Sequence, residues 1–196
     1  MDSGRTSPVR AAWTKATIAA AVGISALGAF VLHLMDRRLW CACGSPVPWA
    51  WDIWSAHNSQ HLIDPYTFTH VLHGVLYYAL LRLVLGARWP SARALLAVTA
   101  EVAWEIIENT NTVIESYRES TIALNYFGDS IVNSLGDVGA FVLGYTAAMC
   151  IPVWMSVVGF TAVEGALLLT IRDGLLLNIL MLLHPIQAIK VWQMGG

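Results

Sequence analysis

Charged residues are scarce in this sequence. Only 12% of its 196 residues are Asp, Glu, Lys or Arg, whereas soluble domains carry about 25%. The net charge of −2 excludes the strongly basic character of a nucleic-acid-binding protein. Hydrophobic residues make up 57% of the chain and the mean hydropathy is +0.59. We therefore expect most of the surface to face membrane lipid, which is the predicted partner.

The sequence also lacks features that would divide it or indicate a familiar catalytic motif. It has no internal repeat, low-complexity tract or long linker, so we expect a single transmembrane domain over residues 1–196. No serine lies in a nucleophile-elbow motif, which argues against a nucleophilic hydrolase. No inverted repeat or pair of broken helices is evident, which argues against a transporter. The sequence contains no Glu-x-x-His motif of the kind found in carboxylate-bridged metal bundles.

Cysteine is rare as well, with three residues in the chain. Cys41 and Cys43 are separated by one residue, and a disulfide between them would be strained by the usual Cα separation. Metal ligation, an intermolecular bridge and two free thiols remain open, because thiolates are strong ligands for soft metals.

Long hydrophobic runs are abundant, and about 20 apolar residues suffice for a helix to cross a bilayer. Such runs occur near 16–35, 69–86, 92–111, 130–151 and 153–171. The run at 175–193 is interrupted by Pro185, which predicts either a kinked sixth span or a helix in the membrane interface. The sequence thus predicts an all-α polytopic transmembrane helical bundle of five or six spans in the bacterial inner (plasma) membrane.

The distribution of basic residues predicts the orientation of this bundle. With the N-terminus in the cytoplasm, the short cytoplasmic segments hold six basic residues and the external ones three. The six are Arg5, Arg10, Lys15, Arg82, Arg88 and Arg93, and the three are Arg37, Arg38 and Arg118. We therefore expect an N-terminus in the cytoplasm, with residues 37–68 and 112–128 outside.

Polar residues follow one face of three successive spans. The second carries Tyr66, His70, His73 and Tyr77, the third carries Glu101, Glu105 and Glu108, and the fourth carries Asp129, Asn133 and Asp137. These spacings place each set on one side of a helix. With a rise of about 1.5 Å per residue, the three stripes fall in one layer in the outer half of the membrane. We expect them to face one cavity, although hydrogen bonding between helices is an alternative explanation.

Small residues recur in the fourth span. Gly136, Ala140 and Gly144 are spaced by four residues, which favours the close approach of a neighbouring helix.

The segment before the second span adds candidate ligands. His57 and His61 are four residues apart, which suits two ligands on one helical face. Asp64 precedes Pro65, where the chain is expected to turn into the membrane. Arg118 and Arg172 are candidate partners for a phosphate or carboxylate head group. Ion pairs with Glu115, Glu119 or Asp173 would explain these arginines equally well.

Four stretches carry a resemblance to known proteins: "WCACG", "HNSQHLIDPYTFTHVLHG", "WEIIENTNTVIESYRESTIALNYFGDSIVNS" and "IRDGLLLN…AIKVWQ". With these the chain resembles an uncharacterised family of bacterial integral membrane proteins, a domain of unknown function, over residues 40–194. It is more faintly similar to VanZ-like membrane proteins, which are associated with glycopeptide resistance. The corresponding residues here would be His73 and Tyr77, Glu105 or Glu108, and Asp129, Asn133 and Gly136. The additional His and Glu residues depart from the VanZ-like pattern, so the resemblance implies a fold and a site but no reaction.

Three hypotheses for function follow. The first is a metal-dependent enzyme acting on a lipid or lipid-linked head group, with a divalent transition metal (Zn, Fe or Mn) as cofactor. Its predicted metal ligands are His70, His73, His57, His61 and Asp64, its catalytic residues Glu105, Glu108, Asp129 and Asp137, and its substrate-binding residues Arg118, Arg172, Asn133 and Tyr77. The second is metal-free acid–base chemistry by a carboxylate pair. The third is a non-enzymatic protein that binds an ion or a partner, whose identity the sequence does not predict.

Overall fold

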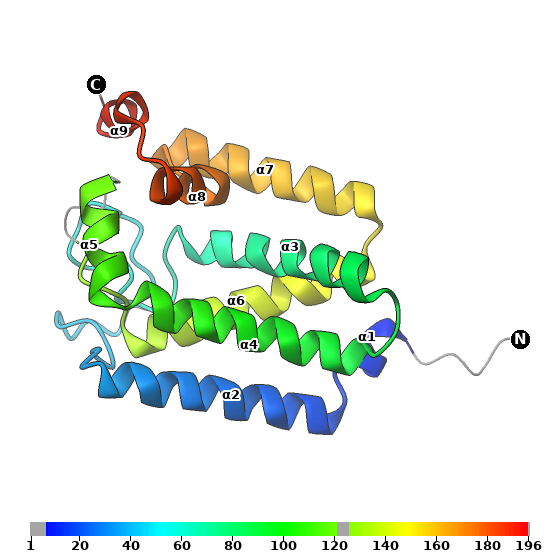
Figure 1. Cartoon of the computed structure of the whole chain (residues 1–196). Coiled ribbons are helices and arrows are strands. Elements are labelled where there is room, and N and C mark those ends of the chain that lie inside the picture. Colours follow the sequence, from blue (N-terminus) through cyan, green and yellow to red (C-terminus); the bar gives the residue numbers. More distant parts are fainter. Residues whose placement is uncertain (1–6, 121–125, 196) are drawn as a thin grey trace, which may run out of the picture.

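The computed structural model describes residues 7–120 and 126–195, and in these residues the chain forms nine helices (Figure 1). They are α1 (Pro8–Ala12), α2 (Lys15–Leu34), α3 (Thr67–Leu85), α4 (Pro90–Glu108), α5 (Asn111–Ser120), α6 (Ile131–Cys150), α7 (Val153–Ile171), α8 (Leu175–Leu183) and α9 (Gln187–Gln193). The prediction of an all-α fold is confirmed. Arg5 and residues 121–125 of the predicted external segment lie outside the described residues.

The five long helices α2, α3, α4, α6 and α7 run side by side along the length of the molecule (Figure 1). The segment between α2 and α3, together with α5 and α9, gathers at one end of this bundle. The α3–α4 and α6–α7 turns and α1 lie at the other end. This arrangement matches the alternation of loops that the sequence predicts for successive membrane crossings.

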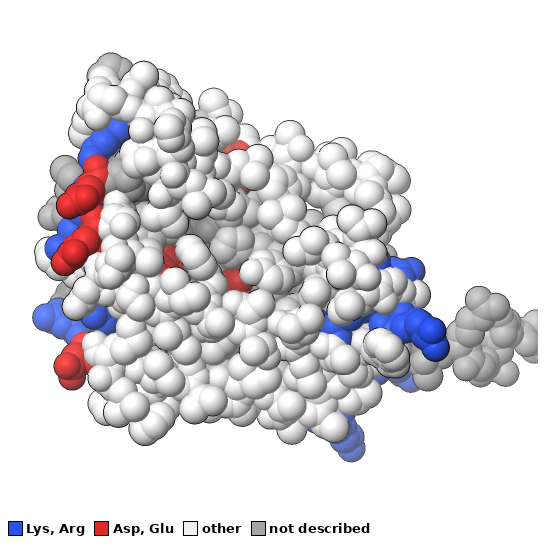
Figure 2. Space-filling model, in the orientation of Figure 1, with Lys and Arg blue, Asp and Glu red and all other residues white. Residues whose placement is uncertain are grey.

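The surface of the bundle is consistent with a place in a membrane. Helices α2, α3, α6 and α7 are long and apolar enough to cross a bilayer. Large apolar side chains on these helices are strongly exposed, for example Leu169 of α7, which is 88% exposed. In water, such exposed apolar surface would favour aggregation. On the face seen in Figure 2, most charged side chains gather at the two ends, and the wide belt between them shows only a few acidic side chains.

The predicted 92–111 span corresponds to α4, which is the exception among the long helices. It has 19 residues like α3 and α7, yet it carries Arg93 and three glutamates. It lies alongside the apolar helices in Figure 1. The total number of spans stays a prediction.

The 175–193 segment forms two short helices rather than one long one. Helix α8 ends at Leu183 and α9 begins at Gln187, with Pro185 between them. Proline supplies no backbone donor and cannot continue α8. At about 1.5 Å per residue, neither helix alone is long enough to cross a bilayer.

The core of the bundle is made where α1, α3, α4 and α6 meet. Ala12, Ala94, Ala97, Phe141 and Tyr145 form its fully buried cluster. Helix α1 packs against α4 and α6. Trp13, which follows α1, donates a hydrogen bond of 3.0 Å from its indole to the Thr146 hydroxyl of α6. The predicted small-residue seam of α6 faces this interior, with Gly136 against the backbone of Leu62 and Gly144 against the backbone of Val71.

The orientation of the bundle can be tested with two cysteines at its opposite ends. Glu115 is exposed on α5, and Cys150 is exposed at the end of α6. We expect a thiol reagent that cannot cross the inner membrane to label Glu115→Cys in spheroplasts, whereas Cys150 should react only after permeabilisation. Site-resolved mass spectrometry would measure both. Labelling of Cys150 alone from outside would reverse the predicted orientation.

Candidate functional site

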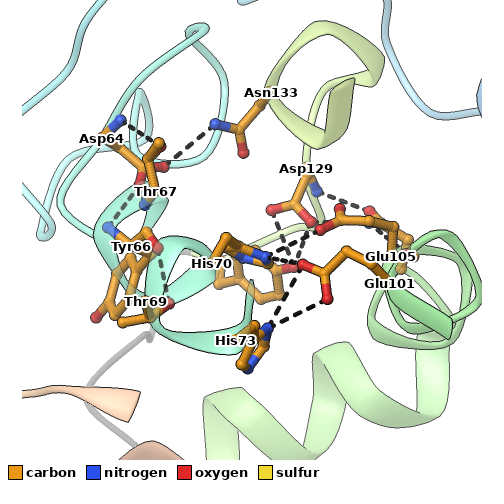
Figure 3. A network of polar contacts seen from close by, with 12 residues as sticks. Asp64, Tyr66, Thr67, Thr69, His70, His73, Glu101, Glu105, Asp129 and Asn133 are labelled. Carbon is orange, nitrogen blue, oxygen red and sulfur yellow. Dashed lines mark hydrogen bonds and ion pairs between the residues drawn. The ribbon is translucent and has the colours of Figure 1, made fainter. Parts of the chain in front are cut away.

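Helix α3 directs two histidines toward the glutamates of α4 (Figure 3). His70 Nδ1 lies 2.6 Å from Glu101 Oε1 and 3.4 Å from Glu105 Oε1. His73, one turn further along α3, places its Nδ1 3.4 Å from Glu101 Oε2. His70, Glu101 and Glu105 are 6%, 0% and 2% exposed, so these groups meet away from bulk solvent.

These side chains form two overlapping sets of potential metal ligands. One set is His70, His73 and Glu101, and the other is His70, Glu105 and Glu108, with one ligand atom of each residue within 4.8 Å of the others. Glu101 and Glu105 both approach the same ring nitrogen of His70, Nδ1. A carboxylate contact of this kind is a usual way to orient a metal-binding histidine. The two sets share His70, so one ion would use one set and leave the remaining glutamate to orient the ring.

Several of the buried carboxylate oxygens have no hydrogen-bond partner among the described residues. They are Glu101 Oε2, both oxygens of Glu105, and Asp137 Oδ1. Leaving buried carboxylate oxygens unpaired is costly, so such atoms call for a cation or a proton. The same observation thus fits a metal ion or a protonated carboxyl group.

A cavity with about 70 Å³ of water-accessible space lies beside these residues. Its polar lining includes Tyr66, His70, His73, Trp104, Glu108, Tyr117, Tyr126, Asp129, Asp137 and Asp173. Its opposite wall comes from α8, through Leu175, Ile179 and Leu182. In Figure 2 the surface is hollowed between α4 and α8, on the side of the bundle, and acidic side chains are visible inside. The cavity combines an acidic floor with an apolar wall.

The charge of the cavity lining is one-sided. Glu108, Asp129, Asp137 and Asp173 line it, and no described Lys or Arg does so. Burial raises the pKa of Asp129 to about 6, against the opposing effect of the Asn109 side chain, which donates a hydrogen bond of 2.8 Å. Burial likewise raises the pKa of Asp173 to about 6, against the Gly174 backbone N–H. An anionic ligand would be repelled here unless a cation accompanied it.

The structure brings most of the predicted catalytic residues and two of the predicted metal ligands together. His70, His73, Glu108, Asp129 and Asp137 line the cavity, and Glu105 lies behind them against His70. Members of all three polar stripes thus meet at one cavity, although Tyr77 and Asn133 do not line it. The chemical roles assigned to these residues stay predictions.

The structure does not bring His57 and His61 to this cavity. They form a separate group with Cys41 and Cys43 in the loop between α2 and α3. Asp64, also predicted as a ligand, uses its carboxylate to accept the backbone N–H groups of Ser59 in the loop and of Tyr66 and Thr67 at the start of α3. The expected ligand set is thus divided among three places.

The four predicted substrate-binding residues do not line the cavity either. Asn133 donates to the carbonyl of His61, and Tyr77 packs edge-on against Phe141 with ring centroids 5.5 Å apart. Arg118 donates to the carbonyl of Tyr126, and Arg172 donates to that of Trp192. None of the predicted ion pairs with Glu115, Glu119 or Asp173 is found for these arginines in the described residues. Arg118 thus joins α5 to the segment before α6, and Arg172 joins the end of α7 to α9. A role of either arginine in substrate binding stays a prediction.

Other residues at or beside the cavity were given no chemical role from the sequence. Glu101 contacts His70 and His73 without lining the cavity. It belongs to the predicted α4 stripe, so the helical spacing could have assigned it to the site. Tyr126 donates to Asp129 over 3.1 Å, and Tyr66 donates to Asp173 over the same distance. Tyr117 and Tyr126 line the cavity because α5 and the segment before α6 fold over its opening. No local pattern in the sequence predicts this fold.

Comparison with known proteins places the chain in a family. Residues 32–195 match the family described as "Protein of unknown function (DUF2585)". The chain belongs to this family. The resemblance drawn from the four sequence stretches is thereby confirmed. The family description names no reaction, and the match gives no support to the VanZ-like similarity.

Relatives of the family occur in several bacteria. A "UPF0314 protein" of Paracoccus denitrificans (strain Pd 1222) is 44% identical over 167 residues, which cover 85% of this chain and 86% of the relative. The "UPF0314 protein R03235" of Rhizobium meliloti (strain 1021) is 46% identical over 176 residues, covering 90% and 89%. A "UPF0314 protein" of Sphingopyxis alaskensis is 41% identical over 176 residues, covering 90% and 94%. No solved structure matches the chain.

Proposed function

We propose that this protein is a metal-dependent enzyme of the bacterial inner membrane that acts on the head group of a lipid or lipid-linked substrate. The observation that carries the proposal is the meeting of His70 with Glu101, Glu105 and Glu108 beside a cavity whose other wall is apolar. Imidazole and carboxylate donors of this kind suit Zn, Fe or Mn.

The arrangement of the ligand residues supports different roles for them. Glu101 lies against Nδ1 of His70 and thereby orients the ring. His70, Glu105 and Glu108 form the set that would hold the metal. The oxygens of Glu105 accept no hydrogen bond among the described residues, although one lies 3.4 Å from His70 Nδ1, and they would gain a cation as partner. A metal at this place would act as a Lewis acid on a substrate oxygen and would lower the pKa of a bound water.

The remaining cavity residues provide groups for proton transfer. Asp129 lines the cavity with a pKa near 6, so it can exchange a proton close to neutral pH. His73 contacts Glu101 and also lines the cavity, so its ring is placed to meet a bound substrate. Both would act on a substrate that the metal holds.

The apolar wall and the position of the opening favour a lipid. A head group can rest against the acidic floor while an acyl chain lies along Leu175, Ile179 and Leu182 of α8. The hollow opens on the side of the bundle, toward the belt between the charged ends (Figure 2). A phosphate-bearing head group would require the metal as its counter-charge, because no described cationic side chain lines the cavity.

Metal analysis of the gently purified, full-length protein tests the first part of the proposal. We expect His70→Ala and Glu105→Gln each to lose about one metal ion per chain relative to wild type. Glu115→Gln, which changes an exposed acid on α5, is the matched control and should keep its metal. All variants should elute as monodisperse species, so that loss of metal is not confused with unfolding.

Lipid composition tests the second part. Membranes from cells producing wild type should contain an altered head-group species, and cells producing Glu105→Gln should not. If wild type carries no metal at this site and takes up none, the metal proposal fails. The close His70–Glu101 pair then favours metal-free acid–base catalysis, in which Glu101→Gln would abolish the lipid change.

A further inference from the structure

A second cluster of ligand-type side chains lies in the loop between α2 and α3. It consists of Cys41, Cys43, His57 and His61, whose ligand atoms all lie within 4.8 Å of one another. Cys41 Sγ is 3.2 Å from His57 Nδ1, and Cys43 Sγ is 3.6 Å from His61 Nε2. None of these four residues lines the cavity described above.

We propose that this cluster is a structural zinc site. Tetrahedral zinc with Zn–S near 2.3 Å and Zn–N near 2.0 Å places sulfur and nitrogen about 3.5 Å apart. The two sulfur–nitrogen distances in the cluster fall on either side of that value. Two thiolates with two imidazoles form a ligand set typical of zinc, and the two thiolates balance the charge of the ion.

The surroundings of the cluster orient its ligands. His61 Nδ1 is hydrogen-bonded to the carbonyl of Val47, which leaves Nε2 to face Cys43. Such a carbonyl contact on the other nitrogen is the usual outer partner of a metal-binding histidine. The Cys43 backbone N–H points to Cys41 Sγ over 3.4 Å, a contact that stabilises a thiolate. The Trp40 indole donates to the carbonyl of Ser45 and closes the turn that carries both cysteines.

The spacing of the ligands also fits, with one departure. His57 and His61 have three residues between them, as in many zinc sites, whereas the single residue between the cysteines is shorter than usual. The Cys41–Gly44 turn, closed by a hydrogen bond of 3.2 Å from the Gly44 N–H to the Cys41 carbonyl, brings the sulfurs of Cys41 and Cys43 to the same group of ligands. On binding, zinc would displace one proton from each thiol, and both protons would pass to solvent.

The site would hold the rim of the cavity. Asn58 and Ser59, which lie between the two histidines, line the cavity. Ser59 accepts a hydrogen bond from the Ser130 backbone N–H over 2.9 Å, and Gln60 donates to the carbonyl of Gly128 over 2.7 Å. Zinc at the cluster would therefore fix the loop that joins the start of α6 to the mouth of the cavity.

Cobalt substitution in the full-length detergent-solubilised protein tests this proposal. We expect Co²⁺ to give a thiolate-to-cobalt charge-transfer band in wild type, and Cys43→Ser and His57→Ala to lose that band together with one equivalent of bound zinc. Cys150→Ser removes the third thiol, which lies at the far end of α6, and should behave as wild type. His70→Ala should keep the band, so the result is independent of the proposed function.

Thiol labelling of wild type provides a measurement that requires no variant. With zinc bound, Cys41 and Cys43 should react with a maleimide at least tenfold more slowly than after chelation, whereas Cys150 should react equally in both states. The proposal is overturned if zinc protects neither thiol, if cobalt gives no charge-transfer band, or if the protein isolated from cells holds a Cys41–Cys43 disulfide and takes up no zinc after reduction.

Discussion

Substituting alanine for Gly74 or Gly144 should prevent the bundle from assembling. Gly74 of α3 lies directly against the backbone of Phe141 and Tyr145 in α6, and Gly144 of α6 lies against the backbone of Val71 in α3. A methyl group at either position would overlap main-chain atoms, which cannot rotate away as a side chain can. The two helices would have to separate along the seam that also positions the cavity.

The expected cost is about 3 kcal/mol or more of folding stability for each substitution, at the upper end of overpacking effects. Thermal unfolding in detergent and the yield of monodisperse protein would measure it. Gly139→Ala is a matched control on α6, because no atom lies within 4 Å of a Cβ placed there. Its stability should be unchanged or slightly raised, since alanine is the better helix former. Equal behaviour of the three variants would contradict the close α3–α6 contact.

Replacing Asp64 by alanine should be nearly as damaging, for an electrostatic reason. Asp64 is fully buried, and one oxygen accepts the backbone N–H groups of Tyr66 and Thr67 over 2.7 and 3.1 Å. The other oxygen accepts the N–H of Ser59 over 3.0 Å and the amide of Asn133 over 3.4 Å. One side chain thus joins the loop, the first turn of α3 and the start of α6.

Alanine at position 64 would leave these donors buried without a partner, at a cost of about 3 kcal/mol or more. Asn, which keeps one acceptor oxygen, should lose less stability than Ala. The exposed Asp52 of the same loop accepts one backbone N–H, from Trp54 over 2.9 Å, so Asp52→Ala should cost less than about 1 kcal/mol. Chemical denaturation in detergent would rank the three variants.

The same variants separate a structural role of Asp64 from metal ligation. Folded Asp64→Asn should retain the metal content of wild type, because its carboxylate is not among the groups that approach His70. Loss of one metal ion from folded Asp64→Asn would instead restore the ligand role that the sequence predicts for this residue.

Periodicity and hydropathy in the sequence were sufficient to predict the long helices. The ranges 16–35, 69–86, 130–151 and 153–171 differ from α2, α3, α6 and α7 by two residues or fewer at each end, because apolar length alone defines a membrane helix. The predicted end of α4 was less accurate, at residue 111 rather than Glu108. The helix stops before Asn109 and Thr110, and the polar residues that follow gave no clear signal of that end. Polar spacing also predicted which faces of α3, α4 and α6 would carry the cavity residues, because one helical turn repeats every 3.6 residues.

The tertiary structure alone decided how the ligand-type residues are divided. His57 lies in the loop before α3, and His70 lies in α3 itself. Nothing in their spacing shows that His57 contacts Cys41 whereas His70 contacts Glu101. That division depends on how the loop folds back between α2 and α6. Contacts between side chains that are distant in the sequence follow from helix packing rather than from a local sequence pattern. Here the close backbone contacts at Gly74 and Gly144 bring α3 and α6 together, so that His70 and Asp137 line the same cavity.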